Sequence, residues 1–373
     1  MTKVDLHIIA FDVPYPADYG GVIDVFCKIK SLHRLGMKLA LHLFEYGRGE
    51  QEALEKYAQE VNYYPRKNSL VKQFSALPFI VNSRQSEKML QRLKQDEVPI
   101  LFEGLHACYY LDHPDLKDRQ KMVRSHNVEH HYYGALAAAT KGWRKRYFQW
   151  EAHRLEQFER RLSHADHLLA ISKSDQQYFQ QYKTDVRLLP PFHPYVVENP
   201  SEAVEDFALY HGNLSVAENQ KAVDFLIEVF YNTDFQLIVA GKNPDKGLRD
   251  KLKRVSNIQL IENPTESELK QLIRSAKINC LPTFQTTGVK LKLIRALIQG
   301  NEVLVNSAML EGTDLKNHCK LAANQVDWRE KLKALFQKDF DPSEVFKRQN
   351  AVAALFNNQD SARILRELCV PAR

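Results

Sequence analysis

Two glycine-containing turns are the first candidates for chemistry in this sequence. PYPADYGGV carries Gly20 and Gly21, and HGNLSVAENQKAV carries Gly212. An apolar helical pattern follows each turn, and the start of a helix offers unpaired N–H groups and a partial positive charge that favour phosphate. Because glycine lacks a Cβ, the backbone at such a turn can approach a ligand closely. Either turn alone is more often only a tight turn, but the pair predicts anion binding at two places.

A third candidate is the stretch QTTGVKLKLIRALIQG. A turn at Gly288 precedes a predicted helix that carries Lys290 and Lys292 in its first turn. The helix dipole disfavours lysines at this end by a few tenths to ~1 kcal/mol each. A bound anion would offset that unfavourable interaction, so the stretch favours an anion site over a pair of merely solvated lysines.

The stretch RSHNVEHHYYG places Arg124, His126, Asn127 and Glu129 close together after a predicted strand. Glu103, in FEGLH, follows a neighbouring strand and is a candidate acidic partner for His126. A histidine beside a carboxylate suits hydrogen bonding or acid–base catalysis, and simple packing of a loop is the alternative. We expect no metal ion here, because HExxH and His-x-His patterns are absent.

The composition is that of a soluble globular protein. Of 373 residues, 44% are hydrophobic and 26% are charged, and the formal net charge is +6. This mild excess permits an acidic small molecule, a membrane surface or nucleic acid as partner. The five cysteines form no CxxC pair, which argues against a disulfide framework or a structural zinc site and favours a reducing cytoplasm. No run is apolar enough to span a membrane, and MTKVDLHIIAFDV has the pattern of a first strand and lacks a cleavage site.

Short apolar runs alternate with helical patterns along the chain. The strand-like runs of the first half are VDLHIIAFDV, KLALHLFEYG, PILFEGLH, QKMVRSHN and ADHLLAISKSD. Helical spacing follows in GGVIDVFCKIKSLHRLG and from about Gly142 to Ser163. Strand, crossover helix and strand in succession are typical of a parallel sheet with helices on both faces.

A proline-rich stretch divides the chain. LLPPFHPYVVENPSEAVED contains four prolines, which predicts an extended linker. DFALYHGN, FQLIVAGKNP, IQLIENP, KINCLPT and NEVLVN then alternate with helices, and one or two helices follow from about Pro342. We therefore expect an α/β fold of two Rossmann-like, doubly wound parallel-sheet domains facing across a cleft. The predicted domains are residues 1–190 and 206–341, with a linker at 191–205 and C-terminal helices at 342–373.

Two further stretches allow more than one interpretation. DFD, from Asp339 to Asp341, has the form of an Asp-x-Asp metal motif, but its place before PSE predicts a helix cap instead. KGWRKRYFQWEAHR combines basic and aromatic residues, which suits contact with acidic lipid or nucleic acid. An ordinary amphipathic helix is the alternative for this second stretch.

Taken together, these stretches resemble bacterial glycosyltransferases of the GT-B fold, in the large retaining family 4, and within it the branch that builds polysaccharides and cell-surface glycans. PYPADYGGVIDV resembles the family's N-terminal Gly-Gly loop, VRSHNVEHHYYGAL its His-Asn-x-Glu segment, and WEAHRLEQFERRLSHADHLLAIS its linking helix and strand. YHGNLSVAENQKAVDFL, LIVAGKNP and TTGVKLKLIRALIQGNEVLVNSAMLEGTDL resemble the start, middle and end of its donor domain. The resemblance spans most of the chain, and the order and spacing of the motifs make it fairly specific.

The resemblance implies a hexosyltransferase that moves a sugar from a UDP- or GDP-linked donor to a glycan or lipid-linked glycan, with retention and without a required cofactor or metal ion. It implies a donor held mainly by the second domain, an acceptor on the first, and a last helix that crosses back to the first domain. Two residues are catalytic candidates: His126 would contact the donor sugar, and Lys292 would stabilise the leaving diphosphate. The donor-binding candidates are Gly20, Gly21, Gly212, Asn213, Asn219, Gly241, Gly288, Lys290, Lys292 and Glu311, and the acceptor-binding candidates are Glu103, Arg124, Asn127 and Glu129.

The sequence departs from the family pattern at the donor site. Family members often carry Arg and Lys as a diphosphate clamp where this chain has Asn213 and Asn219. Thr287 and Arg295 stand at the two positions of the E-x7-E pattern, so the carboxylate expected to hold the ribose is missing. The candidate replacements are Glu311 for that carboxylate, and Lys290 and Lys292 for the lost positive charge.

Other classes of protein remain open on sequence alone. The main alternative is a non-catalytic GT-B homologue that binds a glycan or a partner enzyme. A sugar-nucleotide epimerase of the same fold is less favoured, and so is a periplasmic binding protein, because no signal peptide is predicted. We expect a cytoplasmic protein without a nucleic-acid partner, and peripheral contact with the inner face of the membrane is a further expectation.

Overall fold

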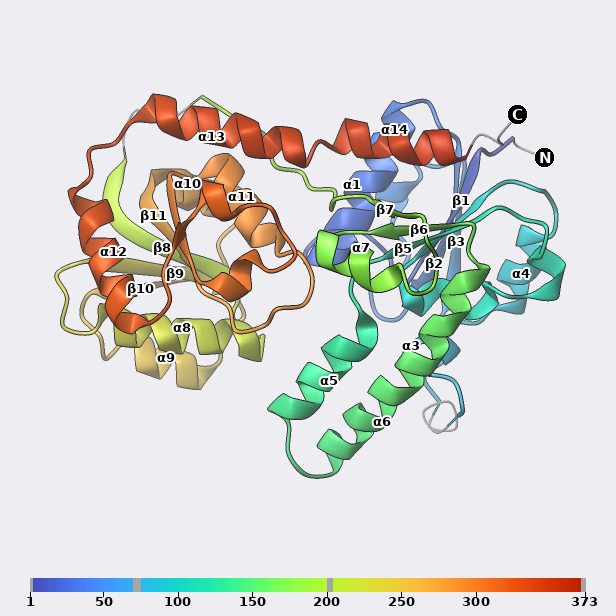
Figure 1. The fold of residues 1–373 in the computed structure, drawn as a ribbon, viewed down its shortest axis with the longest axis horizontal. Coiled ribbons are helices and arrows are strands. Elements are labelled where there is room, and N and C mark those ends of the chain that lie inside the picture. The colour runs from blue at the N-terminus through green and yellow to red at the C-terminus, as the bar shows by residue number, and fades with distance from the viewer. Residues whose placement is uncertain (1–2, 70–74, 200–203, 370–373) are drawn as a thin grey trace. The chain divides into compact units, whose positions relative to one another are not determined.

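The computed structural model describes residues 3–69, 75–199 and 204–369. Contacts divide the chain into two compact units (Figure 1): residues 1–194 with 287–289 and 356–373, and residues 195–286 with 290–355. Within the described residues, no helix combines the length and the apolar character needed to cross a lipid bilayer.

The first unit is built on a seven-stranded sheet whose paired strands are all parallel. The strand order is β3-β2-β1-β4-β5-β6-β7, so the direction of chain progression reverses between β1 and β4. Ligands of open α/β sheets bind at such a reversal, beyond the carboxyl ends of the strands. The strands are β1 (Leu6–Ala10), β2 (Leu39–Glu45), β3 (Glu60–Pro65), β4 (Ile100–Glu103), β5 (Lys121–Ser125), β6 (His167–Ala170) and β7 (Val186–Leu188).

Helices cover both faces of this sheet. Ile8 of β1 packs into a core with α1 and α14, whereas its neighbour Ile9 packs into a second core with α4 and α6. Successive strand residues point to opposite faces, so a strand buried on both faces is a continuous apolar run, as in VDLHIIAFDV. The helices of the unit are α1 (Gly20–Arg34), α3 (Phe79–Asn82), α4 (Glu87–Leu93), α5 (Glu129–Ala139), α6 (Gly142–Glu159), α7 (Lys173–Phe179) and α14 (Asn358–Leu368).

The second unit repeats this architecture with six strands. Its order is β10-β9-β8-β11-β12-β13, again all parallel, and the direction reverses between β8 and β11. The strands are β8 (Glu205–Asn213), β9 (Gln236–Lys242), β10 (Ile258–Glu262), β11 (Ala276–Leu281), β12 (Glu302–Val305) and β13 (Lys320–Leu321). The helices are α8 (Ala217–Phe230), α9 (Lys246–Leu252), α10 (Glu266–Ser275), α11 (Leu291–Gln299), α12 (Gln325–Gln337) and α13 (Pro342–Leu355).

The structure confirms the predicted pair of doubly wound parallel sheets and corrects some element bounds. The long helix predicted to reach Ser163 ends as α6 at Glu159 and continues as a 3-10 turn, Arg160–His164. Lys290 is the extended residue before α11, not part of its first turn. The edge strand β3 was not predicted, because its residues are mostly half-buried and its pattern is weak. The predicted domain boundaries stay predictions, and part of the predicted linker lies outside the described residues.

A row of polar side chains, most of them buried, crosses strands β3, β2 and β1 of the first sheet. His42 Nδ1 lies 2.9 Å from the Tyr64 hydroxyl, and His42 Nε2 lies 2.9 Å from His7 Nδ1. His7 Nε2 in turn lies 3.0 Å from Asp96. Burial lowers the pKa of both histidines, and that of His42 falls well below its usual value. Both rings are therefore neutral in the folded protein at neutral pH.

We predict that mild acid destabilises the first unit through these histidines. An unfolded histidine takes up a proton near pH 6.5, whereas buried His42 does not, so stability is present above pH 6.5 and is lost as the pH falls below it. One such histidine costs about 1.4 kcal/mol at pH 5.5, or roughly 3–6 °C in Tm for a unit of this size. Thermal unfolding at pH 7.5 and 5.5 should show a smaller loss for His42→Gln than for the wild type. Equal losses in His42→Gln and in a control at exposed His164 would contradict the prediction.

Candidate active site

The first candidate cluster lies where the direction of the first sheet reverses. Glu103 is the last residue of β4, and His126 comes directly after β5. Glu103 is fully buried, and its Oε2 lies 2.9 Å from His126 Nε2. Its other oxygen accepts a hydrogen bond of 2.5 Å from Lys28 Nζ, which is also fully buried. The structure therefore confirms that Glu103 is an acidic partner of His126.

Asp24 of α1 completes the cluster. Its Oδ2 lies 3.5 Å from His126 Nδ1, so both ring nitrogens of His126 face a carboxylate. Arg124 donates to Asp24 over 2.8 and 3.2 Å, and it also donates to the backbone carbonyls of Leu189 and Pro190. The two carboxylates and the two buried cations balance in charge, as buried ions must.

This balance keeps the carboxylate of Glu103 ionised. Burial alone would raise the pKa of Glu103, but Lys28 and His126 outweigh it and lower the pKa below its ordinary value.

Lys28 and Arg124 also decide whether this cluster could hold a metal ion. Asp24, Glu103 and His126 each offer a ligand atom within 4.8 Å of the others. Each carboxylate already has a buried cation as partner, so this donor set does not fit a metal ion well.

Asn127 and Glu129 occupy different surroundings. Asn127 is half-buried in the turn after β5, and its carbonyl accepts a hydrogen bond from Ser125. Glu129 is the first residue of α5 and is buried. Burial and the nearby Glu159 raise the pKa of Glu129 to about 8, so its side chain is neutral at pH 7. A neutral buried acid offers an acceptor sugar no negative charge, and the acceptor-binding roles of both residues stay predictions.

The Gly20–Gly21 turn opens α1. The helix begins at Gly20, and no side chain caps its first turn. A Cβ at Gly21 would lie 2.9 Å from the ring of Phe11, whereas a Cβ at Gly20 would meet nothing within 4 Å. Packing against Phe11 therefore explains why glycine stands at position 21. At Gly20 no neighbouring atom covers the backbone, so the start of the helix is accessible there. The predicted anion binding at this turn requires such an open helix start.

The second candidate cluster lies where the direction of the second sheet reverses, beside the carboxyl end of β8. Lys292, in the first turn of α11, lies 3.0 Å from Asn219 Oδ1 and 3.3 Å from the hydroxyl of Tyr210. Burial lowers the pKa of Lys292 to about 8, with nearby Glu218 opposing the shift and Lys290 adding to it. Among the described residues, no carboxylate oxygen lies within 4 Å of the Lys292 ammonium. This half-buried cation has only neutral hydrogen-bond partners.

The turn after β8 is held by its asparagines and by close glycine packing. Asn219 donates to the carbonyl of Asn213 over 2.8 Å, and the side chain of Asn213 accepts hydrogen bonds from Ser215. A Cβ at Gly212 would lie 3.2 Å from the Asn219 side chain. A Cβ at Gly241 would lie 2.0 Å from the Gly212 carbonyl oxygen, so glycine is required there by strand packing.

The remaining donor-site candidates lie on loops. Gly288 has a φ of +69°, in the left-handed region that favours glycine, between β11 and α11. Lys290 is the half-buried N-cap residue of α11. Glu311 is exposed after the 3-10 turn Ser307–Leu310. The structure brings Gly212, Asn213, Asn219 and Lys292 together, and it gives no hydrogen bond or ion pair that joins Glu311 to them.

Arg295, at the position of the missing carboxylate, is tied to its own unit. It is 5% exposed, and its guanidinium donates to Glu266 over 2.6 and 3.2 Å. Its Nε also donates to Gln299 over 3.2 Å. Burial keeps the pKa of neighbouring His211 well below its usual value, with Arg295 and Lys292 adding to the shift. Neutral His211 and paired Arg295 leave Lys292 as the unbalanced cation of this cluster.

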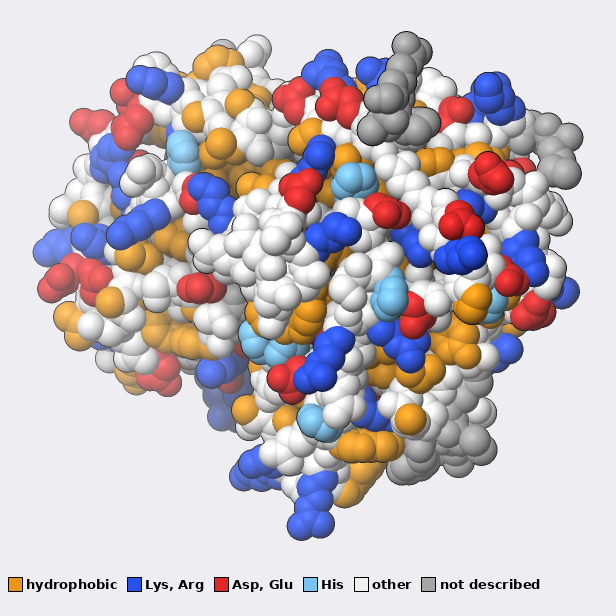
Figure 2. All heavy atoms as spheres, turned by 45° about the vertical axis from the view of Figure 1, so that its right-hand side comes forward, with side chains coloured by type: hydrophobic (Ala, Val, Ile, Leu, Met, Phe, Trp, Pro, Cys, Tyr) orange, Lys and Arg blue, Asp and Glu red, His pale blue; other side chains and the backbone are white. Residues whose placement is uncertain are grey.

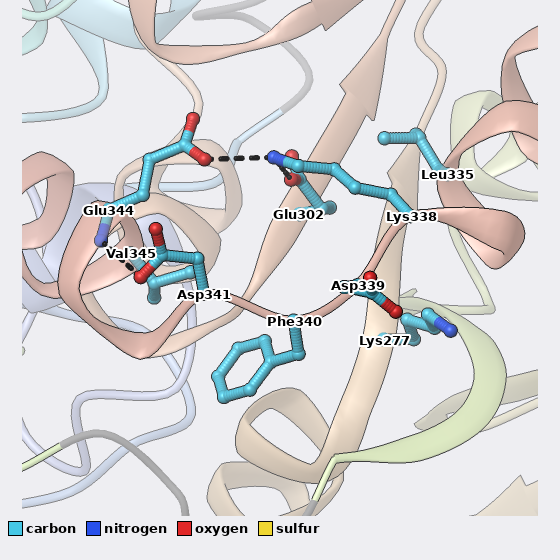
Figure 3. Close-up of a pocket in the computed structure, with 9 residues that line it drawn as sticks. All are labelled: Lys277, Glu302, Leu335, Lys338, Asp339, Phe340, Asp341, Glu344 and Val345. Atoms are coloured by element: carbon cyan, nitrogen blue, oxygen red, sulfur yellow. Dashed lines mark hydrogen bonds and ion pairs between the residues drawn. The ribbon is translucent and has the colours of Figure 1, made fainter.

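The Asp-x-Asp stretch lies elsewhere in the second unit. Asp339 and Asp341 line a small polar pocket (Figure 3), in which Lys338 pairs with Glu302 and Glu344 at 2.8 and 2.9 Å. Asp341 accepts hydrogen bonds from the first backbone N–H groups of α13. The expected helix cap is thereby confirmed.

Sequence reasoning missed three residues of these clusters: Asp24, Lys28 and Tyr210. A signal for the first two was present in GGVIDVFCKIK. Asp24 and Lys28 are four residues apart on the apolar stripe of a helix, and such neighbours face the same side. Charged residues on an apolar stripe indicate a buried pair. Tyr210 carried no comparable signal, because an aromatic residue in a strand is expected in any core.

We predict that Lys28→Met strongly destabilises the first unit, since it leaves Glu103 buried without its cation. Breaking a buried pair costs roughly 3–5 kcal/mol, measured as the free energy of unfolding in urea. Lys30→Met, at a half-buried position of the same helix, is the matched control. Adding Glu103→Gln to Lys28→Met should recover part of the loss, because it removes the unpaired charge. A Lys28→Met protein as stable as the control would show that the pair does not hold the cluster.

Comparison with known proteins gives the family of the second unit. Residues 205–337 match the family described as glycosyl transferases group 1. A Klebsiella pneumoniae protein described as an uncharacterized 44.6 kDa protein in the cps region is 25% identical over 327 residues. The alignment covers 82% of this chain and 84% of that protein.

The whole chain has the fold of several solved structures. TarM matches with a TM-score of 0.71 at 11% identity, over 99% of both chains. Anabaena HepE, solved in complex with UDP and glucose, matches with a TM-score of 0.66 at 11% identity, over 98% of this chain and 99% of HepE. WaaG, a glycosyltransferase involved in lipopolysaccharide biosynthesis, matches with a TM-score of 0.65 at 13% identity, over 98% of this chain and 100% of WaaG. From the family match we conclude that residues 205–337 are a glycosyl transferases group 1 domain, and the whole chain shares the fold of these solved structures.

Proposed function

We propose that this enzyme transfers a hexose from a UDP- or GDP-linked donor to a glycan or lipid-linked glycan, with retention at the anomeric carbon and without a metal ion. Two findings on similar proteins support the substrate class. The Klebsiella relative lies in a cps region, and HepE was solved with UDP and glucose. We place the reaction in the cytoplasm, where nucleotide-sugars are made.

The observation that carries the proposal is the state of Lys292. Its side chain is half-buried, its ammonium has only neutral oxygen atoms within hydrogen-bond distance, and it stands beside the glycine turn at the reversal of the second sheet. A partly desolvated cation without a paired carboxylate is unfavourable, and a bound diphosphate would supply negative charge next to it. The N-terminus of α11 adds a partial positive charge at the same place.

The chemistry then follows from charge and placement. The bond between the anomeric carbon and a diphosphate oxygen breaks, and its electron pair leaves with the diphosphate. An acceptor hydroxyl forms the new bond on the same face of the sugar and passes its proton to the departing diphosphate oxygen. Negative charge grows on the diphosphate as the bond breaks, and a fixed donor aimed at that charge accelerates the step by roughly 10²–10³. Lys292 is the residue we propose for this role.

His126 is proposed to contact the donor sugar, held in place by the first cluster. Its side chain is 13% exposed, and carboxylates face both of its nitrogens. Glu103 and Arg124 were expected to bind the acceptor, but both are fully buried within the unit. Their burial favours a positioning role, in which Glu103 orients the His126 ring and Arg124 holds Asp24 beside it.

We predict that Lys292→Met lowers kcat by roughly 10²–10³ while the protein stays folded, because the leaving diphosphate loses its fixed cation. Transfer is measured by nucleotide release from UDP- and GDP-sugars in the presence of candidate acceptors. Lys331→Met, at an exposed lysine of α12, is the matched control and should leave kcat unchanged.

A second variant tests the position of the charge. Asn219 contacts Lys292. The variant Asn219→Lys in the Lys292→Met background therefore removes the ammonium from position 292 and supplies one from the neighbouring position 219. We expect this double variant to recover part of the lost kcat. Unchanged kcat in Lys292→Met would overturn the role of Lys292, and absence of transfer from every nucleotide-sugar in the wild type would overturn the proposed donors.

We also predict that the enzyme needs no divalent metal ion. The carboxylates of the first cluster already pair with Lys28 and Arg124, and Lys292 takes the place of a metal at the diphosphate. The rate of transfer should therefore be unchanged in EDTA. Loss of activity in EDTA that Mn²⁺ or Mg²⁺ restores would contradict this account.

A further inference from the structure

The helices α5 and α6 form a hairpin in the first unit. They pack along each other, and Figure 1 shows them side by side, extending away from the sheet of that unit. Their connection is short, because α5 ends at Ala139 and α6 begins at Gly142. The hydrophobic core of the unit includes Leu155 and Phe158 from the far end of α6, and Tyr133 of α5 packs against it, but no residue of the tip, residues 134–150, belongs to it. The tip therefore does not stabilise the sheet.

The tip carries one sign of charge. Residues 134–150 contain four Lys or Arg residues and no Asp or Glu. The four are exposed, and within the described part of the chain none forms an ion pair with a carboxylate. An ordinary solvated helix mixes both signs of charge. The basic residues are Lys141, Arg144, Lys145 and Arg146.

Apolar groups lie among these charges. Trp143 is 73% exposed, the highest exposure of any large hydrophobic side chain in the described residues. Ala135, Ala138 and Ala139 are exposed on the adjoining end of α5. Figure 2 shows Lys and Arg side chains beside hydrophobic ones over the lower part of the molecule, where this hairpin lies. Exposed tryptophan is unfavourable in water but suits the headgroup region of a lipid bilayer.

We infer that the tip of the α5–α6 hairpin binds the surface of a membrane that contains anionic phospholipids, with Trp143 inserted among the headgroups and the four basic residues against the phosphates. Two other occupants fit less well. A second copy of this tip would bring like charges together, which opposes dimerisation. A nucleic acid would neutralise the charges but would give the exposed alanines no apolar surface to contact.

Membrane binding through the hairpin goes beyond the transfer reaction and does not require it. It would place the enzyme where lipid-linked acceptors lie. Each Lys or Arg near an anionic surface strengthens binding by about fivefold, so two removed lysines should weaken it roughly 25-fold. Salt should weaken it as well, because the attraction is electrostatic.

Vesicle co-sedimentation tests the inference directly. We expect the full-length protein to bind vesicles of phosphatidylcholine with 30% phosphatidylglycerol (composition chosen at about physiological anionic content) and not vesicles of phosphatidylcholine alone. Lys141→Gln with Lys145→Gln should weaken binding roughly 25-fold. Lys331→Gln with Lys333→Gln, which removes two exposed lysines of α12, is the matched control and should leave binding unchanged.

Two further measurements separate the possible occupants. The fluorescence of Trp143 should shift to shorter wavelength with anionic vesicles, and this shift should vanish in Trp143→Phe but persist in Trp150→Phe. Absence of vesicle binding by the wild type, or equal loss in the α12 control, would overturn the inference. So would a dimer in solution that the tip variants dissolve, or tip-dependent binding of RNA with none to vesicles. None of these readouts uses sugar transfer, so they stand apart from the test of the proposed function.

Discussion

The constraint on which this structure depends is that the central strands of its parallel sheets are buried on both faces. Such strands leave no room for exposed polar chemistry along their length, so charged groups either gather at the strand ends or pair inside the core. Both solutions occur here. The first unit pairs Asp24, Lys28, Glu103 and Arg124 around His126, and the second unit places Lys292 at the end of β8. Each cluster lies where its sheet reverses direction.

The two clusters differ in how their charge is balanced. In the first, every buried cation has a carboxylate partner, so the cluster is complete without a ligand. In the second, Lys292 meets only an amide and a hydroxyl. A complete cluster suits the positioning of one ring, that of His126. An incomplete one suits a ligand that carries the missing charge, which is the chemical demand of a diphosphate leaving group.

Much of the fold and part of the site could be predicted from the sequence. Continuous apolar runs and glycine turns predicted both parallel sheets. The same runs placed Glu103 and His126 at the ends of predicted strands, and Lys292 at the start of a predicted helix. The pairing of Glu103 with Lys28 could not be predicted, because it joins residues 75 positions apart through tertiary packing. The same holds for Asn219, whose neutral side chain lies against Lys292 from another helix. The family pattern shows that Asn219 stands where many members carry a lysine. Only the structure shows that this asparagine contacts Lys292.

The most direct test of the central claim is calorimetric titration of UDP and GDP into the enzyme at pH 8.5, in two buffers of different ionisation enthalpy. Burial lowers the pKa of Lys292 to about 8, so most of its amino groups are deprotonated at pH 8.5. A bound diphosphate should raise that pKa, and binding should therefore take up about 0.7 proton per nucleotide. The account predicts this uptake for the wild type and none for Lys292→Met. Binding without proton uptake, or uptake that persists in Lys292→Met, would contradict the claim that Lys292 holds the diphosphate.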